Sequence, residues 1–463
     1  MTNLEPGEPL PPFADWSLNP LLHPSCTVSG TGGRLVDEDG VEWVDWLSGW
    51  GRNLLGYGDP EVAEAIARQA AAGCGHGVEH RPGRELQRRI VELVPGAEVV
   101  AFGKNGSDVT AGAVRLARAI TGRELVLYHG YHGFHDWYVA SDPSCPGVPR
   151  GLAGTIAPLP FWDLDALGRV LREAPGGVAA AILDPVTAPV PDRHHMLAAM
   201  KLVRSAGGLV IFDEVGTGFR LAPGGAQELL DVVPDLSCFS KAIANGMPLS
   251  VLSGPVRFMQ HLGAIRWGMT FAWEAVSMAA ANATLLALVE RRVPERLWAT
   301  GEALQRAYRE AAAARGLATE LTGAAPRCQI AFADSDGIDA VELRWLVIAE
   351  LAKRHVLTTG VFLPCAAHDE NDIERTAAAF EVALDTASAA VAAGRVDGLV
   401  DPALLGSIRA SRGAAGAPPG SGEAPIAAAP TPSAGPSRRL RHLVRDLLPH
   451  GLVRRIQARR AAP

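Results

Sequence analysis

The chain has 463 residues, of which 48% are apolar and 20% charged, a composition typical of a globular protein with two or three domains. Its net charge of −7 and isoelectric point near 6.0 give no general case for nucleic-acid binding, so we expect no nucleic-acid partner. The six cysteines form no CxxC pair and no metal-type spacing, which indicates reduced thiols and no bound metal.

The first 30 residues are rich in proline and lack the basic and apolar segments of a secretory signal. No run of 18 apolar residues occurs in the chain, so we expect a cytoplasmic protein. Residues 33–46 predict a β-hairpin, because two runs of β-forming residues flank an Asp39–Gly40 turn. Apolar residues at helical spacing predict a helix after Pro60 and a second one over roughly 83–94.

From residue 99 to residue 254, short β-runs alternate with helical stretches. Continuous apolar strands that alternate with helices predict a mostly parallel sheet covered by helices on both faces. Ligands of such sheets bind where the carboxyl ends of strands meet the starts of helices, so chemistry is expected there. The predicted strands are 99–102, 124–128, 178–183, 209–213, 238–239 and 249–253, with helices at 107–121 and 194–206 between them.

The second half of the chain predicts a long helical region at about 275–315 and then a smaller α+β unit. That unit has strands at 329–332 and 356–358 and helices at about 338–353 and 371–393. We therefore expect an N-terminal segment (1–55) that packs with the small domain, a large domain (56–295), the small domain itself (296–400), a linker (401–436) and a tail (437–463).

The last two segments differ in composition from the rest of the chain. The linker is rich in Ala, Gly, Pro and Ser, which predicts disorder because it offers too little apolar surface to bury. The tail carries eight arginines against one aspartate. It is interpreted as a solvated extension, with an acidic partner or an anionic membrane surface as alternatives.

Three polar positions follow strands of the predicted sheet. After the first strand, Gly106 and Ser107 stand at the start of an amphipathic helix, where free backbone N–H groups and the helix dipole favour a phosphate. A simple Ser or Asp helix cap is the alternative. Asp213 ends a buried strand, and its carboxylate needs either an arginine such as Arg220 or a protonated ring nitrogen as partner.

The third position is Lys241, which follows a short strand in the run "FSKAIANGMP". A buried lysine has a lowered pKa, and the neutral amine is the form that attacks a carbonyl to give a Schiff base. A surface lysine is the alternative. Together with the phosphate-type helix start and Asp213, however, Lys241 supplies one partner for each polar group of pyridoxal 5′-phosphate (PLP).

Residues from about 33 to 390 resemble the class III, fold-type-I PLP-dependent aminotransferases, and most closely their glutamate-1-semialdehyde aminomutase-like branch. The most specific motifs are "FDEVGTGFR" (212–220) and "PDLSCFSKAIANGMPLSVLSG" (234–254). Further matches are "GKNGSDVT" (103–110), "GYHGFHDWY" (130–138), "GAQ" (225–227) and "AHDENDIERT" (367–376). The resemblance implies an α/β fold with a mostly parallel seven-stranded sheet, and a smaller α+β domain from both chain ends.

The resemblance also implies roles for individual residues. Lys241 would hold PLP covalently and act as the general base of the proton shift, while Asp213 would pair with the ring nitrogen. Gly106 and Ser107 would bind the phosphate. The ring would lie between Val215 and Tyr131. Further expected contacts are His132 near the ring or substrate, Thr270 reaching the phosphate of a neighbouring subunit in a homodimer, and Glu274 and Asp184 near the substrate.

Two other groups of residues are candidate sites. His129, His132 and His135 are three residues apart, which could suggest a metal, but the PLP pattern accounts for this segment and we expect no metal site. Lys104 is a rival lysine that precedes the phosphate-type loop, and we expect it to be exposed or near the phosphate.

The function expected from the resemblance is a ping-pong aminotransferase that takes an amino group from glutamate or another amino acid. The expected acceptor is the carbonyl of a sugar or specialised-metabolite intermediate. Residues 19–33 lack the arginine with which family mutases bind their substrate, which argues against a 2,1-aminomutase. A second departure, Asp184-Pro185 in place of the common Glu-Pro, concerns the shape of the pocket. The mutase and a PLP-binding scaffold without turnover remain the alternatives.

Overall fold

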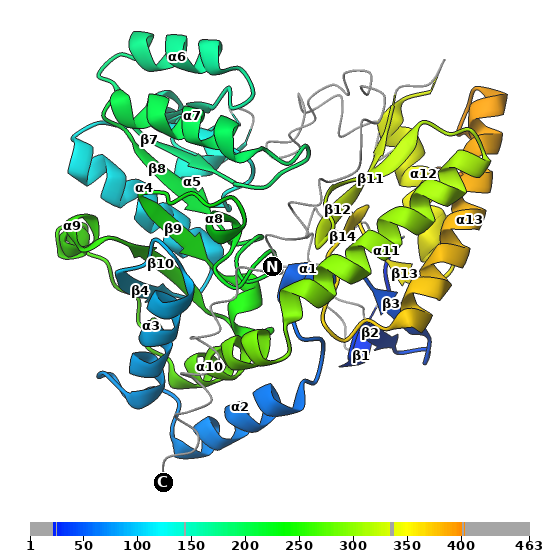
Figure 1. Ribbon diagram of the computed structural model, residues 1–463, viewed down its shortest axis with the longest axis horizontal. Helices are drawn as coiled ribbons and strands as arrows, with labels where there is room; N and C mark the ends of the chain where they lie inside the picture. Colours follow the sequence, from blue (N-terminus) through cyan, green and yellow to red (C-terminus); the bar gives the residue numbers. More distant parts are fainter. Residues whose placement is uncertain (1–21, 25, 143–144, 334–337, 401, 403–463) are drawn as a thin grey trace, which may run out of the picture.

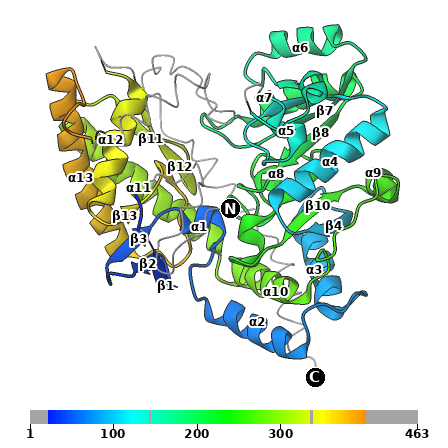
Figure 2. The ribbon, with the colours of Figure 1, turned by 180° about the vertical axis from the view of Figure 1, so that it is seen from behind.

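The computed structural model describes residues 22–24, 26–142, 145–333, 338–400 and 402. A seven-stranded sheet lies on one side of the molecule, and two smaller sheets lie on the other side with the long helices α11, α12 and α13 (Figures 1 and 2). Apart from residue 402, the predicted linker and basic tail lie outside the described residues.

The seven-stranded sheet confirms the expected mostly parallel α/β arrangement. Only β10 runs antiparallel to its neighbours, β4 and β9, and the remaining pairs are parallel. The sequence analysis missed β6, an edge strand of three residues that ends in a proline. The strand order is β4 (Val99–Gly103), β10 (Ser250–Gly254), β9 (Leu236–Phe239), β8 (Leu209–Asp213), β7 (Val178–Leu183), β5 (Leu125–His129), β6 (Ile156–Pro158).

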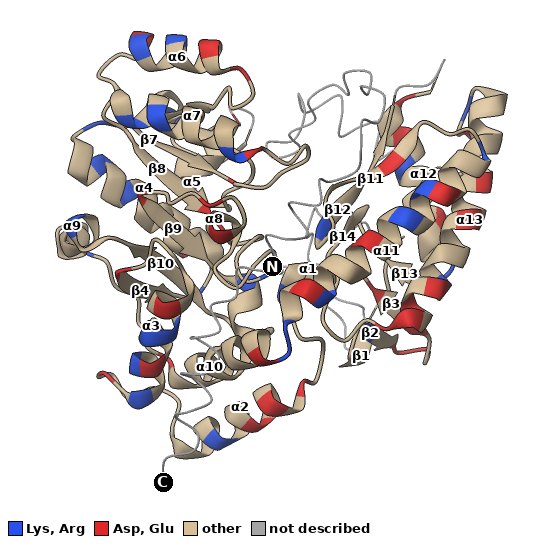
Figure 3. Ribbon diagram, in the orientation of Figure 1, with Lys and Arg blue, Asp and Glu red and all other residues tan. Residues whose placement is uncertain are grey.

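The central strands are apolar throughout because helices cover both faces of the sheet. Ile182 of β7 and Ile211 of β8 belong to the core that includes residues of α4 (Gly106–Thr121). The adjacent residues Leu183 and Phe212 belong to the core with α6 (Leu164–Glu173) and α7 (Arg193–Ser205). Charged side chains accordingly gather on the helices, and the strands of this sheet carry few (Figure 3).

A third core, under the same sheet, takes in residues of α2, α3 and α10, whereas α5 and α9 contribute to the core with α4, and α8 contributes to the core with α6 and α7. Asp59 caps α2, and Pro60 occupies the first helical position, where its missing N–H costs nothing. The helices not yet described are α1 (Ser48–Gly51), α2 (Pro60–Ala72), α3 (Arg81–Leu93), α5 (Asp136–Val139), α8 (Ala226–Leu229), α9 (Val256–Met259) and α10 (Ala275–Glu290).

The helical region predicted at about 275–315 is present, but it is not one continuous helix. It is two helices, α10 and α11 (Val293–Ala314). Arg292 between them has a left-handed backbone with φ of 51°, and Pro294 follows in the first turn of α11. A left-handed residue breaks the hydrogen-bond ladder of a helix, and proline is accepted at a new helix start but not inside one.

The smaller part of the structure combines both ends of the described chain. One sheet has the order β1 (Thr27–Thr31), β2 (Arg34–Asp37), β3 (Glu42–Asp45), β13 (Val356–Leu357). The other has the order β11 (Thr319–Ala324), β12 (Arg327–Phe332), β14 (Val361–Phe362). The predicted hairpin at 33–46 is the β2–β3 pair, and β1 adds to it a strand that the sequence analysis missed.

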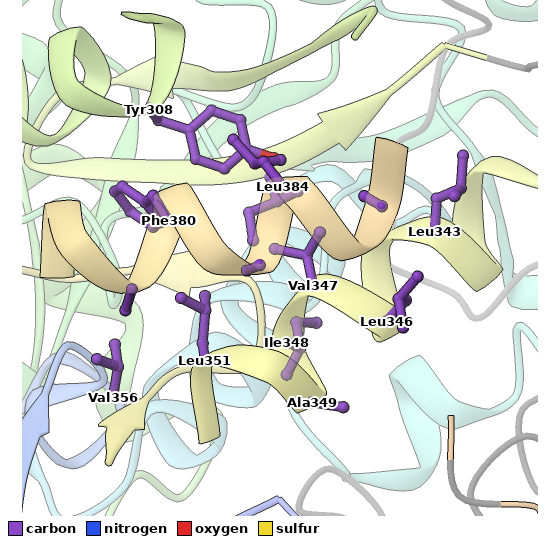
Figure 4. Packing of buried hydrophobic residues seen from close by; sticks show 14 of the residues in the cluster. Tyr308, Leu343, Leu346, Val347, Ile348, Ala349, Leu351, Val356, Phe380 and Leu384 are labelled. Atoms are coloured by element: carbon purple, nitrogen blue, oxygen red, sulfur yellow. The ribbon is translucent and has the colours of Figure 1, made fainter. Parts of the chain in front are cut away.

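One hydrophobic core joins these two sheets to α11, α12 (Ala340–Ala352) and α13 (Glu370–Ala393). It packs Trp46 from the N-terminal segment with Tyr308, Phe362 and Phe380 from the second half of the chain. Figure 4 shows α12 and α13 meeting through this core. We therefore propose residues up to 55 and from 296 to 400 as one domain and residues 56–295 as the other.

Helix α13 is the one described helix whose length and composition would suit a membrane span. Its Phe380, Ala383 and Leu384 are fully buried in the core just described. We interpret α13 as a core helix.

Glu214, directly after β8, fastens the start of α8 to the sheet. Its fully buried carboxylate accepts hydrogen bonds from the backbone N–H groups of Ala226 and Gln227, the Gln227 amide and the Thr217 hydroxyl. Burial raises the pKa of Glu214 to about 7, although these four donors act to lower it. The carboxylate thus holds the turn that follows Asp213.

Replacing Phe380 tests the core of the smaller part. Phe380→Ala removes a fully buried ring that packs edge-on against Tyr308, and should lower the free energy of unfolding by about 3–5 kcal/mol. Urea unfolding measures the loss. Val382→Ala on the same helix is the control, because Val382 is 40% exposed and the change should cost less than about 0.5 kcal/mol. Equal losses in the two variants would contradict the packing described.

The pH dependence of stability tests Glu214. The folded pKa of about 7 lies above the ordinary 4.5, so the folded protein retains a proton that the unfolded chain releases. This contribution is fully present below pH 4.5 and is lost as the pH rises through 7, by about 3 kcal/mol. Urea unfolding should show that the free energy of unfolding of the wild type, relative to that of Glu214→Gln, falls by about 3 kcal/mol between pH 4.5 and pH 8. A constant difference would refute the assignment, and the exposed Glu302→Gln serves as the control.

Candidate active site

The polar residues singled out from the sequence meet at the carboxyl-terminal edge of the seven-stranded sheet. Strand β8 lies between β7 and β9, and its last residue, Asp213, pairs with Cys238 of β9. Asp184 follows β7 and Lys241 follows β9, so their side chains start from the same edge. Residues far apart in sequence are brought together because parallel strands end side by side.

Lys241 begins a short 3₁₀ helix, Lys241–Ala244, directly after β9. Its φ of 44° places it in the left-handed region, which a non-glycine residue seldom occupies. The side chain keeps some accessible surface, but protein atoms enclose it closely, and desolvation is the largest cause that lowers the pKa of its ammonium group. The neighbouring Arg327 lowers this pKa further, which favours the neutral amine.

Asp213 pairs with a histidine. Its Oδ2 lies 2.8 Å from Nδ1 of His132, and both side chains are buried. Its Oδ1 accepts a hydrogen bond of 3.0 Å from the backbone N–H of Val215. Among the described residues, Nε2 of His132 is buried without a hydrogen-bond partner.

Arg220, the alternative partner that the sequence offers for Asp213, binds backbone carbonyl groups. Its buried guanidinium donates to the carbonyl oxygens of Gly51 and Pro364, at 3.1 and 2.7 Å. Desolvation lowers its pKa to about 10. Arg220 therefore ties the N-terminal segment and the segment after β14 to the turn that follows β8, which leaves Asp213 to its histidine.

The start of α4 has the features expected of an anion site. Asn105 occupies the cap position in place of Ser107, and Asp108 completes a capping box by accepting from the Asn105 N–H at 2.7 Å, so the Asp part of the alternative interpretation holds. A Cβ on Gly106 would stand 2.9 Å from the side chain of Val215, so only glycine allows this loop to lie against Val215. The loop after β5 crosses the same helix start, where the Thr110 hydroxyl donates to the carbonyl oxygen of His132 at 2.9 Å.

Two of the expected contacts lie at the surface of the chain. Tyr131, in the loop after β5, is 51% exposed and packs edge-on against Tyr138 at 5.5 Å between ring centroids. Thr270 is exposed in the segment before α10. An exposed Thr270 is compatible with the expected reach into a neighbouring subunit, which stays a prediction.

Glu274 and Lys104, which the sequence gives no reason to connect, form an ion pair. Lys104 Nζ lies 3.0 Å from Glu274 Oε2, and both side chains are mostly buried. Glu274 also caps α10 by accepting from the backbone N–H groups of Val276 and Ser277. Lys104 is thus not exposed, and the other part of its expectation, a position near the phosphate, stays a prediction. Glu274 has a clear structural role, and its contact with substrate stays a prediction.

Asp184 forms an ion pair that the sequence analysis missed. Its Oδ2 lies 2.6 Å from Nη1 of Arg327, the first residue of β12 in the smaller part of the structure. No motif marks Arg327, because its partner is 143 residues away and belongs to another sheet. Only the folded chain brings the pair together.

The three histidines of the segment 129–135 have separate surroundings. His132 faces Asp213, His129 lies 3.4 Å from the Thr187 hydroxyl, and His135 lies 4.0 Å from the Asp108 carboxylate. Burial lowers the pKa of His129. Across the described ranges, no group of three or more His, Cys, Asp or Glu side chains is placed to hold a metal ion.

The assembled residues fit PLP by the chemistry of their donors. The helix start at Gly106 and Ser107 suits a phosphate, the buried Asp213 carboxylate suits a protonated ring nitrogen, and the enclosed amine of Lys241 suits an aldehyde. The unsatisfied buried Nε2 of His132 supports a further polar partner at this place.

Comparisons with known proteins agree with this chemistry. The family described as aminotransferase class-III matches residues 19–336. Glutamate-1-semialdehyde 2,1-aminomutase of Thermomicrobium roseum is 34% identical over 390 residues, which cover 78% of this chain and 91% of that protein. The aminomutase of Aquifex aeolicus is 30% identical over 361 residues, covering 74% and 85%.

Solved structures show the same fold. The FumI protein of Sphingopyxis sp. MTA144, in a form that holds PLP, has a TM-score of 0.75 and 29% identity, covering 81% of this chain and 92% of that one. An omega-transaminase from Sphaerobacter thermophilus has a TM-score of 0.74 at 24% identity, covering 80% and 94%. The predicted fold-type-I PLP-transferase architecture is confirmed. The chain therefore belongs to the class-III aminotransferase family and is a PLP-dependent enzyme of that family.

Proposed function

We propose that this enzyme is a ping-pong aminotransferase that takes an amino group from an amino acid, with glutamate as the first candidate. The amino group then passes to the carbonyl of a sugar or specialised-metabolite intermediate. The observation that carries the proposal is the convergence of Lys241, Asp213 with His132, and the start of α4 at one sheet edge. We further propose a cytoplasmic homodimer in which Thr270 reaches the phosphate of the neighbouring subunit.

When bound, PLP supplies an aldehyde that condenses with amines and a ring that accepts the electron pair left when a proton next to nitrogen is removed. Lys241, whose surroundings favour the neutral amine, would attack the carbonyl carbon and later carry a proton on Nζ from one carbon to another. Asp213, held by His132, would keep the ring nitrogen protonated through its negative charge.

The remaining residues would bind and orient the group. The backbone N–H groups of Gly106 and Ser107 would bind the phosphate at the positive end of the α4 dipole. Val215, fixed against Gly106, would support one ring face, and Tyr131 would cover the other.

A 2,1-aminomutase is the second candidate, because curated relatives at 30–34% identity are described as glutamate-1-semialdehyde 2,1-aminomutase. The absence of arginine from residues 19–33 favours the aminotransferase. A mutase moves the amino group within one molecule and needs no separate donor. Turnover that depends on an added amino donor would support the aminotransferase, and full turnover without a donor would support the mutase.

Lys241→Ala tests the proposed nucleophile and base. We expect turnover to fall by several orders of magnitude, because the variant has no amine at this position to attack the carbonyl or move the proton. A coupled assay with glutamate as donor measures the loss. Lys353→Ala is the matched control, because Lys353 is 60% exposed and forms an ion pair with Glu350 at the end of α12. Full turnover in Lys241→Ala would refute the assignment.

Asp213→Asn tests the proposed partner of the ring nitrogen. The amide oxygen can still accept from the Val215 N–H, but the charge is lost, and turnover should fall on the order of 10²–10³-fold. Single-turnover kinetics on the PLP-loaded variant separates this effect from loss of cofactor. Asp235→Asn is the control, since Asp235 is a similarly buried carboxylate that pairs with Arg204. Equal rates for Asp213→Asn and wild type would contradict the role.

A further inference from the structure

The start of α4, where we propose the phosphate site, has two free hydrogen-bond donors. The Asp108 carboxylate accepts from the backbone N–H groups of Lys104 and Asn105 at 3.1 and 2.7 Å. The Asp108 N–H donates to the Asn105 carbonyl oxygen at 3.1 Å. The part of the chain that the structure describes gives no acceptor for the N–H groups of Gly106 and Ser107. A phosphate bound at this helix start would accept from these two groups.

Two carboxylates lie close to the same helix start, and both would repel a phosphate dianion. Asp108 belongs to the first turn of α4 and directly follows Ser107. Glu274, the cap of α10, forms its ion pair with the Lys104 side chain. Burial acts to raise the pKa of Glu274, but hydrogen bonds from Ser277 and Lys104 lower it overall, so its carboxylate is charged at neutral pH. Because both acidic side chains are mostly buried, solvent screens their charges poorly.

Lys104 supplies a positive charge that is held in place between these groups. Its backbone N–H donates to Asp108, while its Nζ lies 3.0 Å from Glu274 Oε2. The amine also donates to the carbonyl oxygen of Pro248 at 3.1 Å and lies 3.4 Å from the Ser277 hydroxyl. Pro248 precedes β10, whereas the other two partners of the amine stand at the start of α10. The side chain is mostly buried, so its charge stays at the start of α4 and does not move freely in solvent.

We propose that Lys104 is a positioning residue whose charge offsets the Asp108 and Glu274 carboxylates, so that the start of α4 can bind the dianionic phosphate of PLP. This inference rests on the proposed phosphate site at Gly106 and Ser107, and it specifies the charge balance of that site. Lys104 acts at a distance from the phosphate, because its amine stays paired with Glu274. The helix dipole and the two free N–H groups then attract the phosphate without opposition from an unbalanced carboxylate.

The first test compares PLP with pyridoxal, which has the same ring and aldehyde but no phosphate. The full-length protein is freed of cofactor, and the dissociation constant of each compound is measured by equilibrium dialysis. In Lys104→Met the affinity for PLP should fall at least about tenfold, because the phosphate then meets carboxylates that lack their counter-charge. The affinity for pyridoxal should not change, since pyridoxal brings no phosphate to this place. Lys104→Arg keeps the positive charge and should bind both compounds as the wild type does.

The second test separates the charge of Lys104 from mechanical support of the loop. In the double variant Lys104→Met/Glu274→Gln the unbalanced carboxylate is removed together with the cation, and the Gln oxygen can still cap α10. The affinity for PLP should therefore recover most of what Lys104→Met loses. A lysine that only supported the loop would show no recovery, because both partners of the contact are gone, and that result would overturn the proposal. The loss in Lys104→Met should also shrink at high salt, which screens charge.

The matched control is Lys353→Met, which breaks another lysine–glutamate pair, with Glu350 at the end of α12. It should bind PLP as the wild type does. Unchanged PLP affinity in Lys104→Met, or an equal loss of affinity for PLP and pyridoxal, would overturn the role of Lys104. If the wild type itself binds PLP no more tightly than pyridoxal, the proposed phosphate site fails and the proposal fails with it. A wild type that prefers PLP, beside a Lys104→Met variant with the same preference, would refute the role of Lys104 alone.

Discussion

The proposed role of the Lys241 amine as a nucleophile depends on its removal from water beside the end of a buried strand. Desolvation lowers its pKa, and the left-handed backbone at φ of 44° directs the side chain from the end of β9. Asp213, on the neighbouring strand, is held by His132 and the Val215 N–H. The site therefore depends on burying an amine and a carboxylate at one sheet edge, where the carboxylate has partners that offset its desolvation.

The fold supports this burial by joining distant parts of the chain through backbone groups. Arg220 links Gly51 and Pro364 to the turn after β8. Asn245, just after Lys241, accepts from the Leu55 N–H at 2.8 Å. Both chain ends of the described structure are thus fastened to the segments that carry Asp213 and Lys241, which explains why the smaller part is built from the two ends.

Much of this arrangement could be predicted because it is local in sequence. The apolar strands, the polar residue after each, and the glycine at the start of α4 follow from short patterns. Three features could not be predicted in this way. The break at Arg292 depends on one left-handed residue, the His132 partner of Asp213 is 81 residues away, and the Arg327–Asp184 pair forms only when two sheets meet. The residues that recognise substrate are equally hard to predict from sequence, because contacts between distant elements determine them.

The most direct test of the central claim is chemical trapping of the cofactor. The protein is loaded with PLP, reduced with borohydride, digested and mapped by mass spectrometry. A covalent imine between PLP and the Lys241 amine predicts a stable label on the peptide that contains residue 241. A label on Lys104, Lys201 or Lys353 in its place would contradict the account.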